Sequence, residues 1–241
     1  MVTIDDGDEV RSIVTPELRL RFSRLGDRWT HAIDIRPGPW LLLSEAVEWV
    51  SAAEDPTRVV SPTYQELHLQ KDGAAALALL VGQAGPHHFS ASVRVTHRVR
   101  PHRKPHDHGK EYSESLAEFD VADRCRTEVR ALESSYLVYK PPVVTYLGDA
   151  SDIEAAESGA PAWRSRLVWE TDTADNDDVS IGGSDDPGSD TRVAVSGRLP
   201  SGGWRVKAAP RQIVPRGTNR IQYSWSHTRV MNRSSAAEET S

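Results

Sequence analysis

Cysteine and long apolar runs are scarce in this chain of 241 residues. Its one cysteine, Cys125, excludes an internal disulfide framework and a zinc site made of several thiolates. No stretch approaches the 18 consecutive apolar residues of a membrane-spanning helix. The first ten residues, MVTIDDGDEV, are acidic, where a secretory signal would be basic and then apolar. We therefore expect a soluble cytoplasmic protein that has no contact with a membrane.

The composition is that of a folded protein. Hydrophobic residues make up 38% of the chain, which is low, but 27% charge of nearly balanced sign and seven tryptophans argue against intrinsic disorder. A chain of this length buries roughly 70–75% of its unfolded surface, so it can fold without disulfides or a structural metal. The chain shows no internal repeat and no proline-rich linker. These features indicate one domain, and they do not point to any particular activity.

The net charge of −6 is unevenly distributed. Residues 171–190 are rich in Asp, Ser and Gly and have almost nothing to bury, so we expect a disordered acidic loop there. The densest basic stretch is 94–110, which also carries histidines and suits an anion, although a solvated hairpin tip explains it as well. Because this stretch contains no aromatic side chain for stacking on bases, we do not expect nucleic-acid binding.

Apolar residues recur mainly with a period of two, which is typical of strands buried on one face. The runs 17–24 and 29–35 alternate around a turn at Gly26, and they predict a β-hairpin. The run 77–81 is apolar throughout, like a strand covered on both faces. Most odd positions between 117 and 131 are apolar: Ala117, Phe119, Val121, Cys125, Val129 and Ala131. We therefore expect Cys125 to point inward as an inert side chain.

These patterns predict an all-β fold with ten to twelve short strands, arranged as a single-domain antiparallel β-sandwich. Barrel closure stays open, because strand patterns do not distinguish it. Residues 43–53 have helical spacing but could equally start a strand, so we expect at most one or two short helices. The expected organisation has four parts. They are a flexible acidic tail over 1–14, one all-β domain over 15–231, loop insertions at 101–112 and 171–190, and a disordered tail over 232–241.

One candidate metal site follows from the histidines of the basic stretch. His102, His106, His108 and Glu111 place imidazoles and a carboxylate within reach of one divalent ion. The spelling H-x-H-x-x-E resembles the ligand run of cupin-type metal barrels, although the carboxylate comes early and the leading glycine pattern is missing. An exposed histidine-rich loop explains the same residues without a metal.

Aromatic residues supply a candidate ligand-binding surface. Trp163, Trp169, Tyr223 and Trp225 share a strand parity that could gather them on one layer, where they could stack on sugar rings. Packing in the core of an all-β protein accounts for the same residues.

Other chemistry finds little support in the sequence. His87 and His88 lie next to each other at a strand start, so at most one can face a given pocket, as a general base or as a structural histidine. No serine or cysteine has a recognisable nucleophile context, and the glycine-rich segments match no nucleotide motif. The acidic run around Asp177 fails the spacing of a calcium loop.

Four segments carry a resemblance to a known group of proteins. They are SPTYQELHLQ at 61–70, ALLVGQAGPHHFSASVRV at 78–95, EFDVADRCR at 118–126 and ESSYLVY at 133–139. In this order they resemble a group of conserved hypothetical proteins of planctomycete-type bacteria, over about residues 60–140. The resemblance implies a bacterial cytoplasmic protein, and it brings no activity and no catalytic residue.

The sequence thus leaves two hypotheses for function. The first is a non-catalytic all-β module that binds a carbohydrate-like ligand or a protein partner. The second is a metal-assisted enzyme that uses the histidine-rich loop. The oligomeric state stays open.

Overall fold

The fold was analysed in a computed structural model of the chain. The structure describes residues 1–35, 41–46, 55–101, 110–138, 143–144, 162–164, 166–170, 178–183, 191–198 and 204–232. The described residues form strands and connections and contain no helix. Two large antiparallel sheets contribute to one hydrophobic core, which confirms the predicted all-β sandwich.

The first sheet has nine strands in the order β1-β2-β3-β4-β5-β12-β18-β17-β14. Its N-terminal strands are β1 (Thr3–Asp6), β2 (Val10–Val14), β3 (Leu18–Leu25), β4 (Arg28–Ile35) and β5 (Leu41–Ala46). Its remaining strands are β12 (Ser134–Val138), β14 (Ala162–Arg164), β17 (Thr191–Arg198) and β18 (Trp204–Pro210).

The second sheet has eight strands in the order β13-β15-β16-β19-β10-β9-β8-β7. Four of them are β7 (Glu66–Asp72), β8 (Ala75–Ala84), β9 (His87–Pro101) and β10 (Lys110–Cys125). The others are β13 (Val143–Val144), β15 (Arg166–Glu170), β16 (Asp178–Gly183) and β19 (Gly217–Asn232). A small sheet pairs β6 (Arg58–Val59) with β11 (Ala131–Leu132) in parallel.

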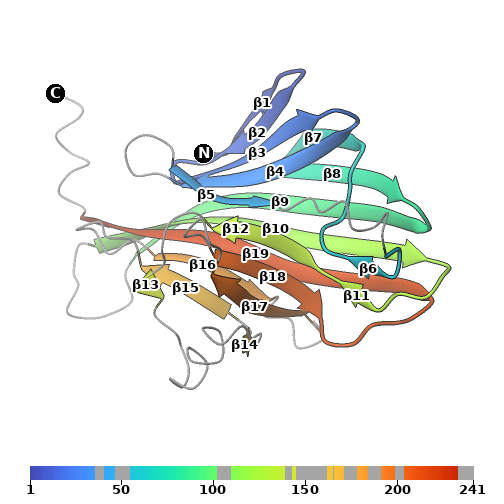
Figure 1. Ribbon diagram of the computed structural model, residues 1–241. Helices are drawn as coiled ribbons and strands as arrows, with labels where there is room; N and C mark the ends of the chain where they lie inside the picture. Colours follow the sequence, from blue (N-terminus) through green and yellow to red (C-terminus); the bar gives the residue numbers. More distant parts are fainter. Residues whose placement is uncertain are drawn as a thin grey trace.

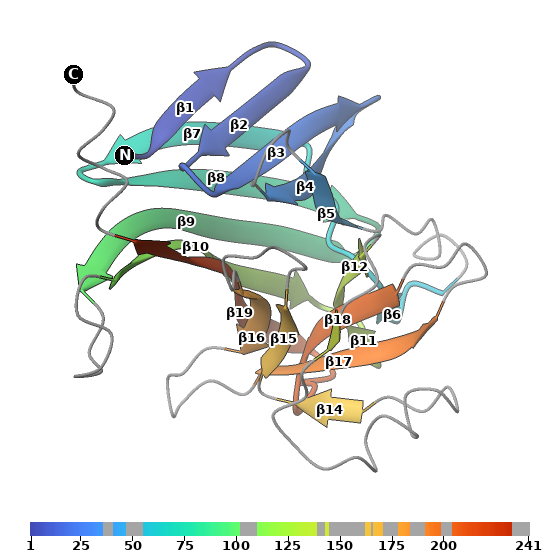
Figure 2. The same cartoon turned by 90° about the vertical axis from the view of Figure 1, so that its left-hand side faces the viewer.

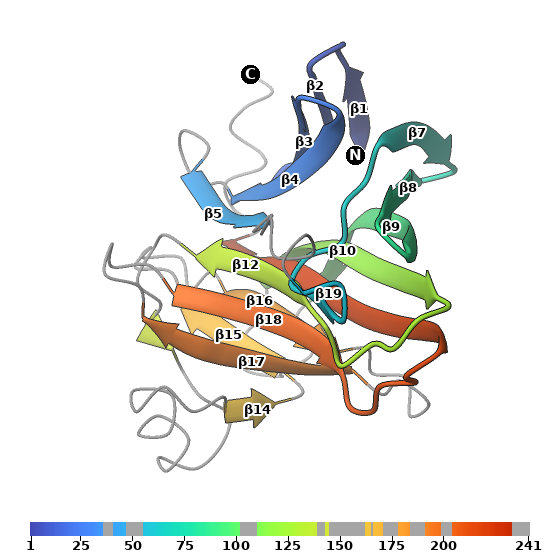
Figure 3. The same ribbon diagram turned by 45° about the vertical axis from the view of Figure 1, so that its right-hand side comes forward.

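The two large sheets stack along their length. Figure 1 and Figure 2 show the blue strands β1 to β5 facing β7 to β10, and Figure 3 shows β12, β18 and β17 layered over β15, β16 and β19. The small sheet lies at one end of the stack, where β9 begins and β10 ends (Figure 1). Side chains from both inner faces therefore share the interior between the sheets.

The predicted hairpin is present as β3 and β4. Phe22 pairs with His31, and the turn between the strands contains Gly26 at a φ of 64°, where glycine is favoured. The apolar side chains of β3 are buried at Leu18, Leu20 and Phe22, as the alternation predicts.

The longest strands, β9, β10 and β19, form the floor of the core. Their pairing runs without a register shift from Lys110 to Cys125 of β10 against β19. The odd positions of β10 point inward, and Cys125 is buried among them, as predicted. Along this inner row, polar side chains occupy the two ends of β10, whereas Ala117, Phe119 and Val121 occupy the middle.

The outer face of the eight-stranded sheet carries ion pairs between its strands. Arg94 pairs with Asp72, and Arg98 pairs with Glu114. These two arginines belong to the basic stretch 94–110, so part of its charge is balanced within the sheet itself. Exposed ion pairs of this kind contribute at most about 1 kcal/mol each.

Three parts of the expected organisation need correction. Residues 1–14 were expected to be a flexible tail, but β1 and β2 pair there and the side chains of Val2 and Ile13 are buried. The helical alternative for 43–53 is wrong over its first part, because β5 reaches Ala46 as a strand. Within 171–190, residues 178–183 form β16 between β15 and β19, so disorder is wrong for that segment. Most of the expected C-terminal tail lies outside the described residues.

Candidate functional site

A chain of three polar side chains crosses the middle of the sandwich. His31 of β4 and Tyr136 of β12 come from the nine-stranded sheet, and Tyr223 of β19 comes from the eight-stranded sheet. The Nε2 atom of His31 lies 2.9 Å from the Tyr136 hydroxyl, which lies 2.5 Å from the Tyr223 hydroxyl. The Tyr223 ring stacks on Phe119 with 4.8 Å between the ring centroids, and this stacking fixes its orientation.

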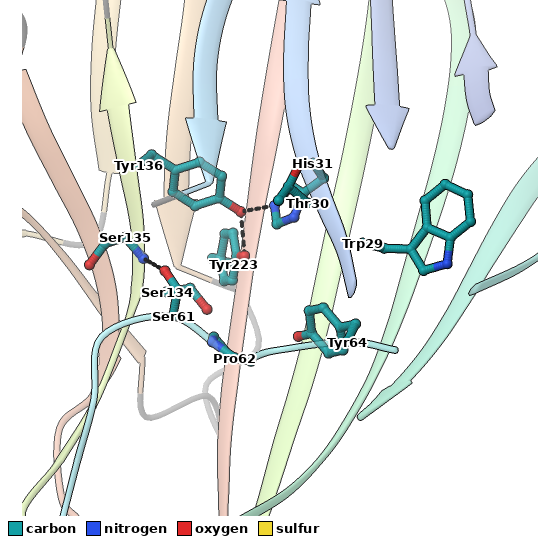
Figure 4. Close-up of a pocket in the computed structure, with 10 residues that line it drawn as sticks. All are labelled: Trp29, Thr30, His31, Ser61, Pro62, Tyr64, Ser134, Ser135, Tyr136 and Tyr223. Carbon is teal, nitrogen blue, oxygen red and sulfur yellow. Dashed lines mark hydrogen bonds between the residues drawn. The ribbon is translucent and has the colours of Figure 1, made fainter. Parts of the chain in front are cut away.

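A small pocket opens beside these three side chains (Figure 4). Its wall on one side is the connecting segment 55–65, which we call the strap. The lining residues come from β4, the strap, β12 and β19: Trp29, Thr30, His31, Ser61, Pro62, Tyr64, Ser134, Ser135, Tyr136 and Tyr223. The pocket has room for about one water molecule.

Hydrogen bonds from backbone amides hold the strap against the pocket. The Ser135 amide donates to the Ser61 hydroxyl over 3.3 Å, and the Trp29 amide donates to the Tyr64 carbonyl over 2.7 Å. The strap crosses β8 at Gly82, where a Cβ atom would come within 2.0 Å of the Thr63 carbonyl oxygen. Glycine at position 82 therefore permits the close approach of the strap to the sheet.

The titratable groups of the pocket are uncharged at neutral pH. Burial lowers the pKa of His31 to about 4, so the imidazole is neutral. Burial raises the pKa of Tyr64 and of Tyr136 well above the usual value for a phenol, and it raises that of Tyr223 as well. The pocket thus presents neutral hydroxyl groups, a neutral imidazole and aromatic rings.

A second polar cluster lies near one end of the inner row. Glu17, only 5% exposed, accepts a hydrogen bond from Ser113, and another from Ser115 over 2.7 Å. The Nδ1 atom of His97 lies 3.2 Å from the same carboxylate. His97 and His227 are the cross-strand partners of Ser115 on its two sides. Burial lowers the pKa of both histidines, that of His227 to about 4.

A third cluster lies at the opposite end of the row, where β9 begins and β10 ends. His87 and Asp123 are fully buried, and the His87 Nδ1 atom lies 2.8 Å from a carboxylate oxygen of Asp123. The His87 Nε2 atom lies 2.7 Å from the carbonyl oxygen of Pro56 in the strap and 3.9 Å from the sulfur of Cys125. His88 is exposed, so the two adjacent histidines point to opposite faces, as predicted.

The four predicted ligand-binding aromatics are divided between the sheets. Trp163 lies in β14 of the nine-stranded sheet, whereas Trp169 lies in β15 and Tyr223 and Trp225 lie in β19 of the eight-stranded sheet. Trp225 is 0% exposed and Tyr223 is 2% exposed. These two side chains therefore pack in the core, the second explanation that the sequence offered, and Tyr223 also lines the pocket.

The predicted metal residues are only partly covered by the structure. His102, His106 and His108 lie outside the described residues, and Glu111 lies in β10 opposite Pro101 and Met231. Within the described ranges, no group of three or more His, Cys, Asp or Glu side chains is placed to hold a metal ion.

Several pocket residues were not identified from the sequence as site residues. His31 had a usable signal, because it shares the inward parity of Trp29 and Ile33. Tyr136 and the strap carried no such signal in the sequence. Tyr136 meets His31, for example, although the two residues are 105 positions apart in the chain.

In the part of the chain that the structure describes, no helix is long and apolar enough to cross a membrane.

Comparisons with known proteins add no function to this geometry. No protein-family model, no curated protein and no solved structure matches the chain.

Proposed function

We propose that the protein is a non-catalytic β-sandwich binding module whose ligand site is the pocket behind the strap. We further propose that its ligand is a neutral molecule rich in hydroxyl groups, of carbohydrate type. The observation that carries the proposal is the uncharged polar lining between His31, Tyr136 and Tyr223.

The chemistry of the lining favours a hydroxyl group over an ion. Serine and tyrosine hydroxyls both donate and accept hydrogen bonds, as the hydroxyl groups of a sugar do. A charged ligand would lose its hydration here without gaining an opposite charge, because the titratable pocket residues are neutral. The aromatic rings of Tyr64 and Tyr136 add apolar surface for the carbon side of such a ligand.

The size of the pocket limits what enters the closed form. Room for one water suits one hydroxyl group of a ligand. A whole sugar ring requires the strap to move, because Ser61, Pro62 and Tyr64 form one wall. The proposal therefore includes displacement of the strap when a larger ligand binds.

Other parts of the proposal rest on the sequence. The single cysteine and the resemblance to planctomycete-type proteins support a bacterial cytoplasmic setting. The ion pairs of Arg94 and Arg98 with neighbouring carboxylates reduce the charge available for nucleic acid.

A glycan array tests the proposal. Neutral oligosaccharides should be bound in preference to uronate-containing and sulfated ones. Replacing Tyr136 by Phe should weaken binding by roughly 5- to 150-fold, since one hydrogen bond in a buried site is lost. The control is Tyr112→Phe, which removes a phenol hydroxyl from the other face of β10.

Two results would contradict the proposal. One is an array on which the wild-type protein binds no neutral glycan. The other is binding that Tyr136→Phe and Tyr112→Phe leave equally strong, which would place the ligand elsewhere on the molecule.

A further inference from the structure

The small sheet β6–β11 carries two walls of the pocket. The strap includes β6 and supplies Ser61, Pro62 and Tyr64, and β12, which follows β11 in the chain, supplies Ser134 and Tyr136. Backbone bonds tie the two walls together, for example from the Glu133 amide to the Val59 carbonyl over 2.9 Å. Tyr223, by contrast, belongs to the eight-stranded sheet. The position of the strap relative to that sheet therefore affects how open the pocket is.

We infer that His87 and Asp123 form a latch, which holds the small sheet against the eight-stranded sheet through the Pro56 carbonyl and so keeps the pocket closed. This inference rests on the proposed function for the identity of the site that the latch controls. The latch itself is defined by its geometry.

Both nitrogen atoms of the His87 ring face hydrogen-bond acceptors. The Asp123 carboxylate accepts at Nδ1 and the Pro56 carbonyl accepts at Nε2, over 2.8 and 2.7 Å. Neither acceptor carries a hydrogen, so the ring must donate from both nitrogen atoms and is an imidazolium. His87 and Asp123 thus form a buried ion pair whose second donor reaches across to the strap.

The surroundings make the charge on His87 necessary for the closed position. The titratable groups that face its ring are Asp123 and Cys125, both from β10. Phe89 of its own strand stacks on it, and the strap contributes the neutral carbonyl of Pro56. A neutral ring would leave the carboxylate of Asp123 without an opposite charge. If its one remaining hydrogen stays on Nδ1, donated to Asp123, the Nε2 lone pair faces the Pro56 oxygen.

The latch is closed at neutral pH and opens in alkaline solution. Burial disfavours the charged ring, but the hydrogen bonds to Asp123 and Pro56 and the charge of Asp123 outweigh it and raise the pKa of His87 to about 9. Ties such as the bond from the Val129 amide to the Pro215 carbonyl do not titrate. Loss of the His87 proton therefore weakens one specific contact of the small sheet with the eight-stranded sheet, the hydrogen bond between His87 and the Pro56 carbonyl.

Cys125 provides a built-in probe, since its sulfur lies beside the latch and is buried. Iodoacetamide alkylates a thiolate by forming a carbon–sulfur bond and releasing iodide. The protection of Cys125 is the ratio of its alkylation rates in the unfolded and the native protein at the same pH. With a pKa of about 9, this protection should fall about tenfold between pH 8 and pH 10.

The variant His87→Gln should show low protection that does not change over this pH range. The matched control is His88→Gln, at the exposed neighbouring position, which should behave like the wild-type protein. Because His87→Gln also destabilises the core, the wild-type pH profile is measured beside it and does not depend on any variant.

Three outcomes would contradict the proposed latch. Protection could stay constant to pH 10, His87→Gln could be as protected as wild type, or alkylation could depend on urea as steeply as global unfolding does. A fall in protection without any binding of neutral glycans would uphold the latch and contradict the proposed function instead.

Discussion

The phenol oxygens of Tyr136 and Tyr223 lie 2.5 Å apart and join the two sheets in the middle of the core. Tyr136 also meets the His31 ring, so its hydroxyl serves two partners. Replacing Tyr136 by Phe should lower the free energy of unfolding by about 2–3 kcal/mol, because both partners lose a hydrogen bond in the interior. Urea denaturation measures this change. Tyr112→Phe, which removes a phenol hydroxyl away from the pocket, is the control and should cost less than Tyr136→Phe.

The stability of the protein should fall in acid through two histidines. Burial lowers the pKa of His31 and of His227 to about 4, against about 6.5 in the unfolded chain. Between these values the unfolded state binds more protons than the folded state, so stability decreases as the pH falls from 6.5 to 4. The loss is on the order of 3 kcal/mol per histidine at most. Urea denaturation at a series of pH values measures it, and His227→Asn should flatten part of the slope.

The stability should also fall in alkaline solution, through His87. Its pKa is raised to about 9 in the folded state, so the folded state keeps a proton that the unfolded state has lost above pH 6.5. The contribution is complete below pH 6.5 and is lost as the pH rises through 9; it amounts to about 3 kcal/mol at most. Denaturation curves from pH 6 to pH 10 should show this decline in wild type and a smaller one in His87→Gln. An equal decline in both proteins would contradict the assignment.

Glu17 should stabilise the end of the core that it occupies. Glu17→Gln replaces an acceptor of two serine hydroxyls by a group that can accept at one atom only. We expect a loss of about 1–3 kcal/mol in the free energy of unfolding. A double-mutant cycle with Ser115→Ala should give a coupling energy of at least about 0.5 kcal/mol. Glu114→Gln, on the outer face of β10, is the control and should be nearly neutral.

Gly82 should determine how closely the strap packs against β8. In Gly82→Ala the added Cβ would stand 2.7 Å from the Cα atom of Tyr64, so the strap backbone has to shift. We expect faster amide hydrogen exchange at Trp29, whose amide donates to the Tyr64 carbonyl. A crystal structure of the variant with an unmoved strap would contradict this expectation.

The sequence allowed the strands with clear alternation to be predicted. The hairpin of β3 and β4 and the inward positions of β10 follow directly from a period of two. β1 and β16 were missed because their acidic neighbours suggested disorder, although Val179 and Ile181 alternate within β16. There, pairing with neighbouring strands outweighs a composition that is poor in apolar residues.

The pocket could not be assembled from the sequence for a different reason. Its central residues His31, Tyr136 and Tyr223 come from strands that are far apart in the chain. Only the order of strands in the two sheets brings them together, and local periodicity does not encode that order. The sequence did predict that His87 and His88 point apart, because that statement needs one strand only.

The polar residues at the two ends of β10 also fix how this strand aligns with its neighbours. A long strand with a uniformly apolar face could slide by two residues and keep its hydrophobic contacts. In β10 such a slip would carry Asp123 away from His87 and Ser115 away from Glu17. A buried carboxylate at each end of the core would then lose a hydrogen-bond partner. The polar ends of β10 therefore fix its register, because misaligned pairing during folding would be higher in free energy.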